Sequence, residues 1–199
     1  MMEKILILGL GNILFSDEGL GVHMAHYLQE KYRFEPAVDV LDGGTLAYQL
    51  MDHIALYDHV LIVDAALMSQ TPGSIFVFRY EDAVKWGWHI TAGAHEIEIV
   101  GVLTSLKLLG ELPDVQFIAM EPYDIVSTHI GLSPVVRDRM TALEQVIIEK
   151  LGSWGIQCIP VREVSFDRSD NDLLDIAPDK TGKENSHVFG ASAQSRQGS

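Results

Sequence analysis

The chain has 199 residues, of which 47% are hydrophobic, and it carries a formal net charge of −14. This length and composition are typical of one globular domain with a sizeable core. The acidic balance disfavours nucleic acid and anionic membranes as partners, whereas it suits a cation. No apolar run approaches the roughly 20 residues that span a bilayer. With one cysteine, Cys158, an intrachain disulfide is excluded, and we expect a cytoplasmic protein.

The first half of the chain alternates strand and helix patterns. A continuous apolar run indicates a strand that is buried on both faces. Such runs and the helical pattern between them predict, in chain order, a strand Ile5–Leu8, a helix Asp17–Lys31, a strand Val38–Leu41, a short helix Thr45–His53 and a strand His59–Ala65.

The second half continues the alternation. After a turn, the patterns predict a strand Ser74–Tyr80, an irregular stretch 81–94, a helix His95–Leu109, a strand Val115–Met120, an irregular stretch 121–132 and a helix Ser133–Leu151. Alternating strands and helices predict a parallel or mixed sheet with helices on both faces. From residue 156 the composition becomes polar, so we expect one domain over 1–155 and a flexible appendage over 156–199.

The first strand is followed by Gly9-Leu10-Gly11, which raises the possibility of a nucleotide phosphate site. The dinucleotide fingerprint needs a third glycine where this chain has Leu14. Asp17 and Glu18 would also meet an incoming phosphate with negative charge. A Rossmann-like nucleotide-binding enzyme therefore remains only as an alternative, kept open by Asp42, which stands where a ribose-binding acid would.

Known hydrolase motifs are absent from the sequence. There is no Gly-x-Ser-x-Gly elbow and no Walker A sequence, and Cys158 falls beyond the expected core. His95-Glu96 begins like a zinc-protease helix, but the second histidine of that motif is replaced by Ile99.

A possible metal site follows from the expected topology. In open parallel sheets, sites form beyond the carboxyl ends of strands where the strand order reverses, and an order 2-1-3 places strands one and three side by side. Glu18 follows the first strand, Asp64 lies near the end of the third, and His95 opens a helix that can face the same edge. Two carboxylates and one imidazole would bind a metal and leave coordination positions open.

Each of these residues also has a plain structural explanation. Glu18 can stabilise a helix start, Asp64 can cap the following segment, and a single histidine such as His95 more often packs or hydrogen-bonds. Asp42 and the two glycines after it read most simply as a turn. His23 and His26 are expected on the surface of the first helix, and Asp17 as a charge at the helix start.

Five segments together resemble the nickel–iron hydrogenase maturation endopeptidases: GLGNILFSDEGLGVH, DGGT, LIVDA, GAHEIEIVGVL and IAMEPYDIVSTHIGLSPVV. They occur in order over Lys4–Leu151. The resemblance implies a three-layer α/β/α sandwich around a twisted, mostly parallel five-stranded sheet. It also implies a cytoplasmic protease that removes the C-terminal extension of a hydrogenase large-subunit precursor after nickel insertion.

The resemblance assigns roles to individual residues. Glu18, Asp64 and His95 match the metal-contacting residues, and Asp42 with Gly43 and Gly44 matches a turn near the substrate cleft. We expect nickel to arrive with the substrate, no tightly held cofactor, and a monomer. The general base is open between Asp42 and Asp64, although the family is often grouped with aspartic-type peptidases. A non-catalytic nickel chaperone is a second alternative.

Overall fold

The computed structural model describes residues 3–45, 50–86 and 94–166, with the side chains of 94–98 outside the description. Its central sheet has five strands in the order β3-β1-β4-β6-β5. Their bounds are β1 Ile5–Leu10, β3 Asp39–Gly44, β4 His59–Ala65, β5 Ile75–Arg79 and β6 Asp114–Met120. All neighbours are parallel except the edge strand β5, which runs antiparallel to β6. The expected 2-1-3 order of the first three predicted strands is confirmed by the order β3-β1-β4.

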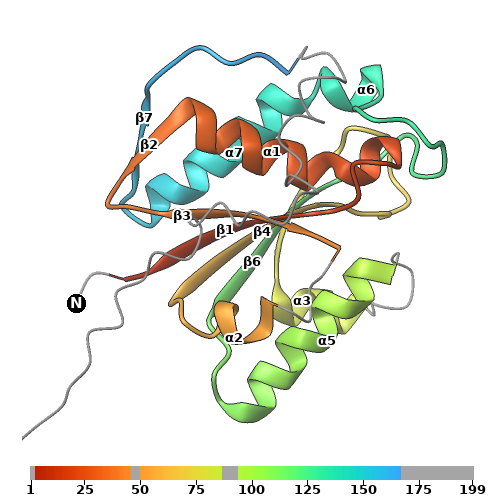
Figure 1. Ribbon diagram of the computed structural model, residues 1–199. Coiled ribbons are helices and arrows are strands. Elements are labelled where there is room, and N and C mark those ends of the chain that lie inside the picture. The colour runs from red at the N-terminus through yellow and green to blue at the C-terminus, as the bar shows by residue number, and fades with distance from the viewer. Residues whose placement is uncertain (1–2, 46–49, 87–93, 167–199) are drawn as a thin grey trace, which may run out of the picture. The chain divides into compact units, whose positions relative to one another are not determined.

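Helices cover both faces of this sheet (Figure 1). The helical segments are the 3-10 turn η1 Ser16–Gly19, α1 Leu20–Lys31, α2 Met51–Ile54, α3 Tyr80–Trp86, α5 Ala94–Leu109, α6 Pro134–Arg137 and α7 Met140–Ser153. Helices α1 and α7 lie on one face, and α2, α3 and α5 on the other. The α/β fold with three layers is therefore confirmed. No helix among the described residues is long and apolar enough to cross a membrane.

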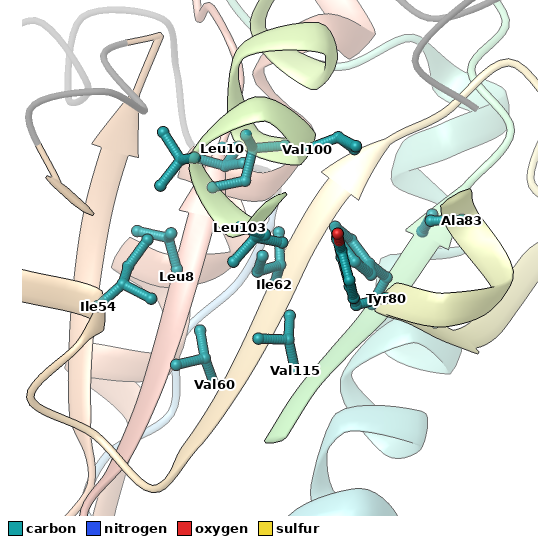
Figure 2. Close-up of a cluster of buried hydrophobic side chains, with 14 of the residues drawn as sticks. Leu8, Leu10, Ile54, Val60, Ile62, Tyr80, Ala83, Val100, Leu103 and Val115 are labelled. Atoms are coloured by element: carbon teal, nitrogen blue, oxygen red, sulfur yellow. The ribbon is translucent and has the colours of Figure 1, made fainter. Parts of the chain in front are cut away.

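The strand period divides the core into two halves. In β1, Ile5 and Ile7 pack against α1 and α7, whereas Leu6, Leu8 and Leu10 pack toward α5. Figure 2 shows the second half, where Leu8, Leu10 and Ile62 of the strands meet Val100 and Leu103 of α5. Both faces are buried, which explains why β1 and β4 are continuous apolar runs.

Some predicted elements were wrong. The stretch 81–94 was expected to be irregular, but Tyr80–Trp86 forms α3, whose two turns are too short to show a periodic pattern. The last helix is broken into α6 and α7 between Arg137 and Met140. Residues 46–49 of the expected helix Thr45–His53 lie outside the described residues, and α2 forms its end.

A second small sheet extends the fold beyond the expected boundary at residue 155. Strand β7 (Gln157–Pro160) pairs antiparallel with β2 (Tyr32–Glu35), and neither was predicted. Farther along, Phe166 stacks on Tyr27 of α1 at 3.8 Å between ring centroids. The start of the expected appendage thus belongs to the folded unit, and residues 167–199 lie outside the described part.

Candidate active site at the carboxyl ends of the strands

A glycine in β1 and another in α1 allow the helix to pack against the sheet. A Cβ on Gly9 would collide with the main-chain oxygen of Gly21 in α1, and one on Gly21 would collide with the main-chain oxygen of Val63 in β4. Only residues without side chains allow this approach. These two glycines therefore serve helix–strand packing, which places the start of α1 beside the end of β4.

Glu18 lies in η1, the turn that leads into α1. Its main-chain oxygen accepts a hydrogen bond from Asn12 N at 3.2 Å. Gly11, with φ of 131°, passes so close that a Cβ there would overlap this oxygen. The turn η1 also contacts β4. Glu18 is half-buried, and these contacts hold its main chain at the edge of the sheet.

Asp64 is the penultimate residue of β4 and only 1% of it is exposed. Its Oδ1 accepts a hydrogen bond from the Ala65 main-chain nitrogen at 2.8 Å. In the neighbouring strand β6, Ala119 is in register with Asp64. The carboxylate therefore lies at the carboxyl end of the central strand of the sheet, as expected.

His95 lies in the first turn of α5, and its side chain is outside the described part. Helix α5 is followed by β6, so it runs antiparallel to the strands and starts at their carboxyl ends. One turn farther on, Val100 packs in the same cluster as Leu10, the last residue of β1 (Figure 2). The backbone position of His95 is thus at the same edge of the sheet as Glu18 and Asp64.

Asp42 lies near the end of β3, paired with Gly9 of β1. Its Oδ2 is 3.0 Å from Nε2 of His26 in α1, with side-chain exposures of 39% for Asp42 and 20% for His26. Its Oδ1 accepts a hydrogen bond from Gly44 N at 2.9 Å. His26 is partly exposed as expected, whereas His23 is buried, because almost every side of α1 is covered.

The two glycines after Asp42 have different surroundings. A Cβ on Gly43 would lie 2.7 Å from Cδ1 of Leu8 and 2.8 Å from Cδ2 of Leu10, so this position is small because it packs on β1. Gly44 has φ of 48° and its main-chain oxygen accepts a hydrogen bond from Gly11 N at 3.0 Å. Their contacts are accounted for by the turn, and a role in a substrate cleft stays a prediction.

Asp17 is the residue whose role the sequence did not indicate. It is fully buried, and its carboxylate accepts hydrogen bonds from the segment after β6. The sequence indicated no more than a charge at the helix start. Only the adjacency of two acids in Asp17-Glu18 hinted that one of them was needed for something else.

The arrangement suits the binding of a cation. Carboxylates of Glu18 and Asp64 come from two elements that meet at one sheet edge, and an imidazole on α5 would complete a three-ligand set. Among the side chains that the structure describes, which exclude His95, no three His, Cys, Asp or Glu residues are grouped to hold a metal. Three ligands at an edge leave positions for groups carried by another molecule.

Comparison with known proteins supplies the decisive observation. A family model described as hydrogenase maturation protease (HycI) matches residues 22–150. The chain belongs to the hydrogenase maturation proteases. This protease is 34% identical over 166 residues to the hydrogenase 2 maturation protease of Escherichia coli, covering 82% of this chain and 99% of that one.

Solved structures agree with the family assignment. The hydrogenase maturating endopeptidase HybD from E. coli superimposes with a TM-score of 0.74 at 30% identity, covering 79% of this chain and 98% of that one. A [NiFe] hydrogenase maturation protease HycI from Thermococcus kodakarensis, at 23% identity and a TM-score of 0.62, shares the fold over 75% and 93% of the two chains. The comparisons thus identify the chain as a peptidase. They argue against the two alternatives, a non-catalytic nickel chaperone and a nucleotide-binding enzyme.

Proposed function

We propose that this protease removes the C-terminal extension of the large-subunit precursor of a nickel–iron hydrogenase after nickel has been inserted. The nickel is carried by the substrate, and Glu18, Asp64 and His95 recognise it. The supporting observation is that three separate chain segments bring a Glu, an Asp and a His to one edge of the sheet. The cytoplasmic location and the monomeric state stay predictions.

The chemistry of the three residues fits a docked nickel ion. Imidazole is a good nickel ligand, and two carboxylates offset the charge of a divalent ion. Cysteines of the substrate would supply the other ligands. Docking through the metal converts the encounter of enzyme and peptide bond into a reaction within one complex, which is worth several orders of magnitude in rate.

Asp42 is our candidate for the general base. Asp64 is almost fully buried and is assigned to the metal, whereas 39% of the Asp42 side chain is exposed and can meet a water molecule. Strands β3 and β4 flank β1, so Asp42 and Asp64 are separated by two strand spacings, about 10 Å. Through Gly9, Asp42 is in register with Val63, so its side chain leaves the sheet on the face opposite to that of Asp64, and a bound peptide would meet both groups only at the carboxyl edge. Polarisation of the peptide carbonyl by the metal is compatible with this arrangement.

The first experiment measures shortening of a purified nickel-loaded precursor by mass spectrometry. Glu18→Gln, Asp64→Asn and His95→Ala are each expected to slow shortening by at least about 100-fold, because each removes a ligand that positions the substrate. Glu149→Gln and His53→Ala are the matched controls, since these residues lie away from the carboxyl ends of the strands. Normal processing by all three ligand variants would refute the assigned site.

The second experiment separates metal recognition from hydrolysis. Asp42→Asn is expected to bind nickel-loaded precursor normally and to leave it uncut, whereas Asp64→Asn is expected to lose both binding and cleavage. Precursor without nickel should remain uncut by the unmodified protease. Cleavage of nickel-free precursor at the normal rate would rule out recognition through the metal.

A further inference from the structure

Asp17 is buried without contact to solvent, although it is an acidic residue and stands next to Glu18. Its carboxylate accepts four hydrogen bonds. Oδ2 accepts from Tyr123 N and Asp124 N, both at 2.9 Å, and from Ser133 Oγ at 2.8 Å. Oδ1 accepts from Ser133 N at 2.7 Å. A buried carboxylate with this many donors is stable, and its loss would leave the donors unsatisfied.

The segment that Asp17 holds lies at the edge where the proposed site is. We call residues 121–133 the rim segment; it has little regular secondary structure and follows β6 directly. The last residue of β6, Met120, is in register with Ala65, the neighbour of Asp64. At its start, Glu121 is also buried and accepts a hydrogen bond from Met68 N at 2.7 Å.

Main-chain hydrogen bonds join the rim segment to the turn that carries Glu18. Asp17 N donates to Asp124 O at 3.0 Å, Ser16 N donates to His129 O at 2.8 Å, and His129 N donates to Leu14 O at 3.1 Å. Ser16 has φ of 49°, which is uncommon for a residue other than glycine. Such a conformation persists where surrounding contacts impose it, and here those contacts come from the rim segment.

The rim segment is also stabilised by hydrogen bonds within itself. Asp124 Oδ1 accepts hydrogen bonds from Val126 N and Ser127 N, both at 3.0 Å. The hydrogen bonds of Ser127 and Val126 lower the pKa of this carboxyl group. The segment is therefore ordered by carboxylates, with Asp17 as the one that joins it to η1.

We propose that Asp17 is a positioning residue for Glu18. It fixes the turn η1 against the rim segment, so that the Glu18 carboxylate is held at the carboxyl end of β4 before the substrate arrives. Asp17 does not touch the substrate, and the proposal rests on the proposed role of Glu18 in nickel recognition. The two adjacent acids then have different roles, since Asp17 anchors the turn and Glu18 contacts the nickel.

The test uses Asp17→Asn, in which an NH₂ group replaces one acceptor oxygen and faces a donor whichever way the amide turns. Amide hydrogen exchange at Tyr123, Asp124 and Ser133 should become faster. The kcat for nickel-loaded precursor should fall by about 10-fold to 100-fold, since a displacement of about 1 Å at a reacting group has that effect.

A stability-matched control separates positioning from general destabilisation. Glu144→Ala disrupts a buried cluster of α1 and α7 on the face of the sheet that these helices cover, away from η1. At a temperature where both variants are fully folded, Glu144→Ala should retain kcat and Asp17→Asn should not. Equal losses in the two variants, or unchanged kcat in Asp17→Asn, would overturn the proposal.

A second variant covers the case in which Asp17→Asn does not fold. Ser133→Ala removes one of the four donors and the N-cap of α6, and leaves the Asp17 carboxylate with three hydrogen bonds. We expect a twofold to fivefold lower kcat for it, and an unchanged kcat would refute the proposal. Hydrogen exchange does not depend on the substrate, so a failure of the unmodified protease to cut the precursor would refute the proposed function and leave the exchange result standing.

Discussion

Gly21 offers a sharp test of how α1 is placed against the sheet. A Cβ added at this position would lie 2.1 Å from the Val63 main-chain oxygen and 2.4 Å from that of Leu10. Real Cβ contacts are essentially never shorter than 3.0 Å, so Gly21→Ala leaves a shortfall of about 0.9 Å. Both obstacles are main chain of central strands, so the helix itself must move.

The size of the effect follows from two opposing terms. Overpacking costs about 1–3 kcal/mol, and the upper end applies because the obstacles are backbone. Alanine is favoured over glycine inside a helix by about 1 kcal/mol. The expected net loss is about 2 kcal/mol of the free energy of unfolding, which lowers the Tm of a domain of this size by about 4–8 °C.

The matched control is Gly152→Ala in α7. Nothing lies within 4 Å of a Cβ added at Gly152, so this variant should be up to about 1 kcal/mol more stable than the unmodified protein. Urea unfolding of both variants at 25 °C gives the comparison. Because α1 continues directly from η1, Gly21→Ala should also slow precursor processing by about 10-fold or more. A Gly21→Ala protein as stable as Gly152→Ala would refute the close approach.

Three further predictions concern the contacts between α1 and α7 and the second sheet. Glu144 accepts hydrogen bonds from Lys31 at 2.7 Å, Tyr27 at 3.0 Å and Tyr32 at 2.6 Å. Glu144→Ala should therefore lower the free energy of unfolding, measured in urea titrations, by about 2 kcal/mol. The value is moderate because 22% of the Lys31 side chain is exposed to solvent. Burial, and then the bond to Glu144, raise the pKa of Tyr32 from 10.0 to about 12. Because Tyr32 has a higher pKa in the folded protein, it contributes stability below pH 10, and this contribution is lost as the pH rises from 10 to 12. Tyr32→Phe should therefore flatten this part of the curve of unfolding free energy against pH. An unchanged curve would contradict the raised pKa of Tyr32. Burial also raises the pKa of the Cys158 thiol, so Cys158 should react with a disulfide reagent at pH 8 more slowly than glutathione does. An equal rate would show that the surroundings of β7 do not bury the thiol.

The inner strands of the central sheet were predictable because β1, β4 and β6 are buried on both faces. The run His59–Ala65 was predicted with its observed bounds, and Ile5–Leu8 was predicted two residues short because Gly9 interrupts the apolar pattern. Gly9 remains in the strand because α1 crosses there and needs a residue without a side chain. A glycine that serves packing cannot be told from one that ends a strand by pattern alone.

The small sheet was not predictable for a different reason. Strands β2 and β7 have four residues each, and Tyr32 pairs with Pro160 at the other end of the domain. Neither strand has a hydrophobic pattern long enough to identify it. His23 shows a similar limit, because a histidine on an amphipathic helix looks exposed until a second layer covers that helix.

The sequence by itself determined which strands form the centre of the sheet and that Glu18, Asp64 and His95 begin or end elements at one edge. Long apolar runs and the direction of parallel crossovers carry this information locally. Only the tertiary structure showed that Asp17, next to Glu18, is fully buried and accepts hydrogen bonds from the rim segment. The donors that bury Asp17 include Ser133, 116 positions later in the chain, and no local pattern reports contacts made at that separation.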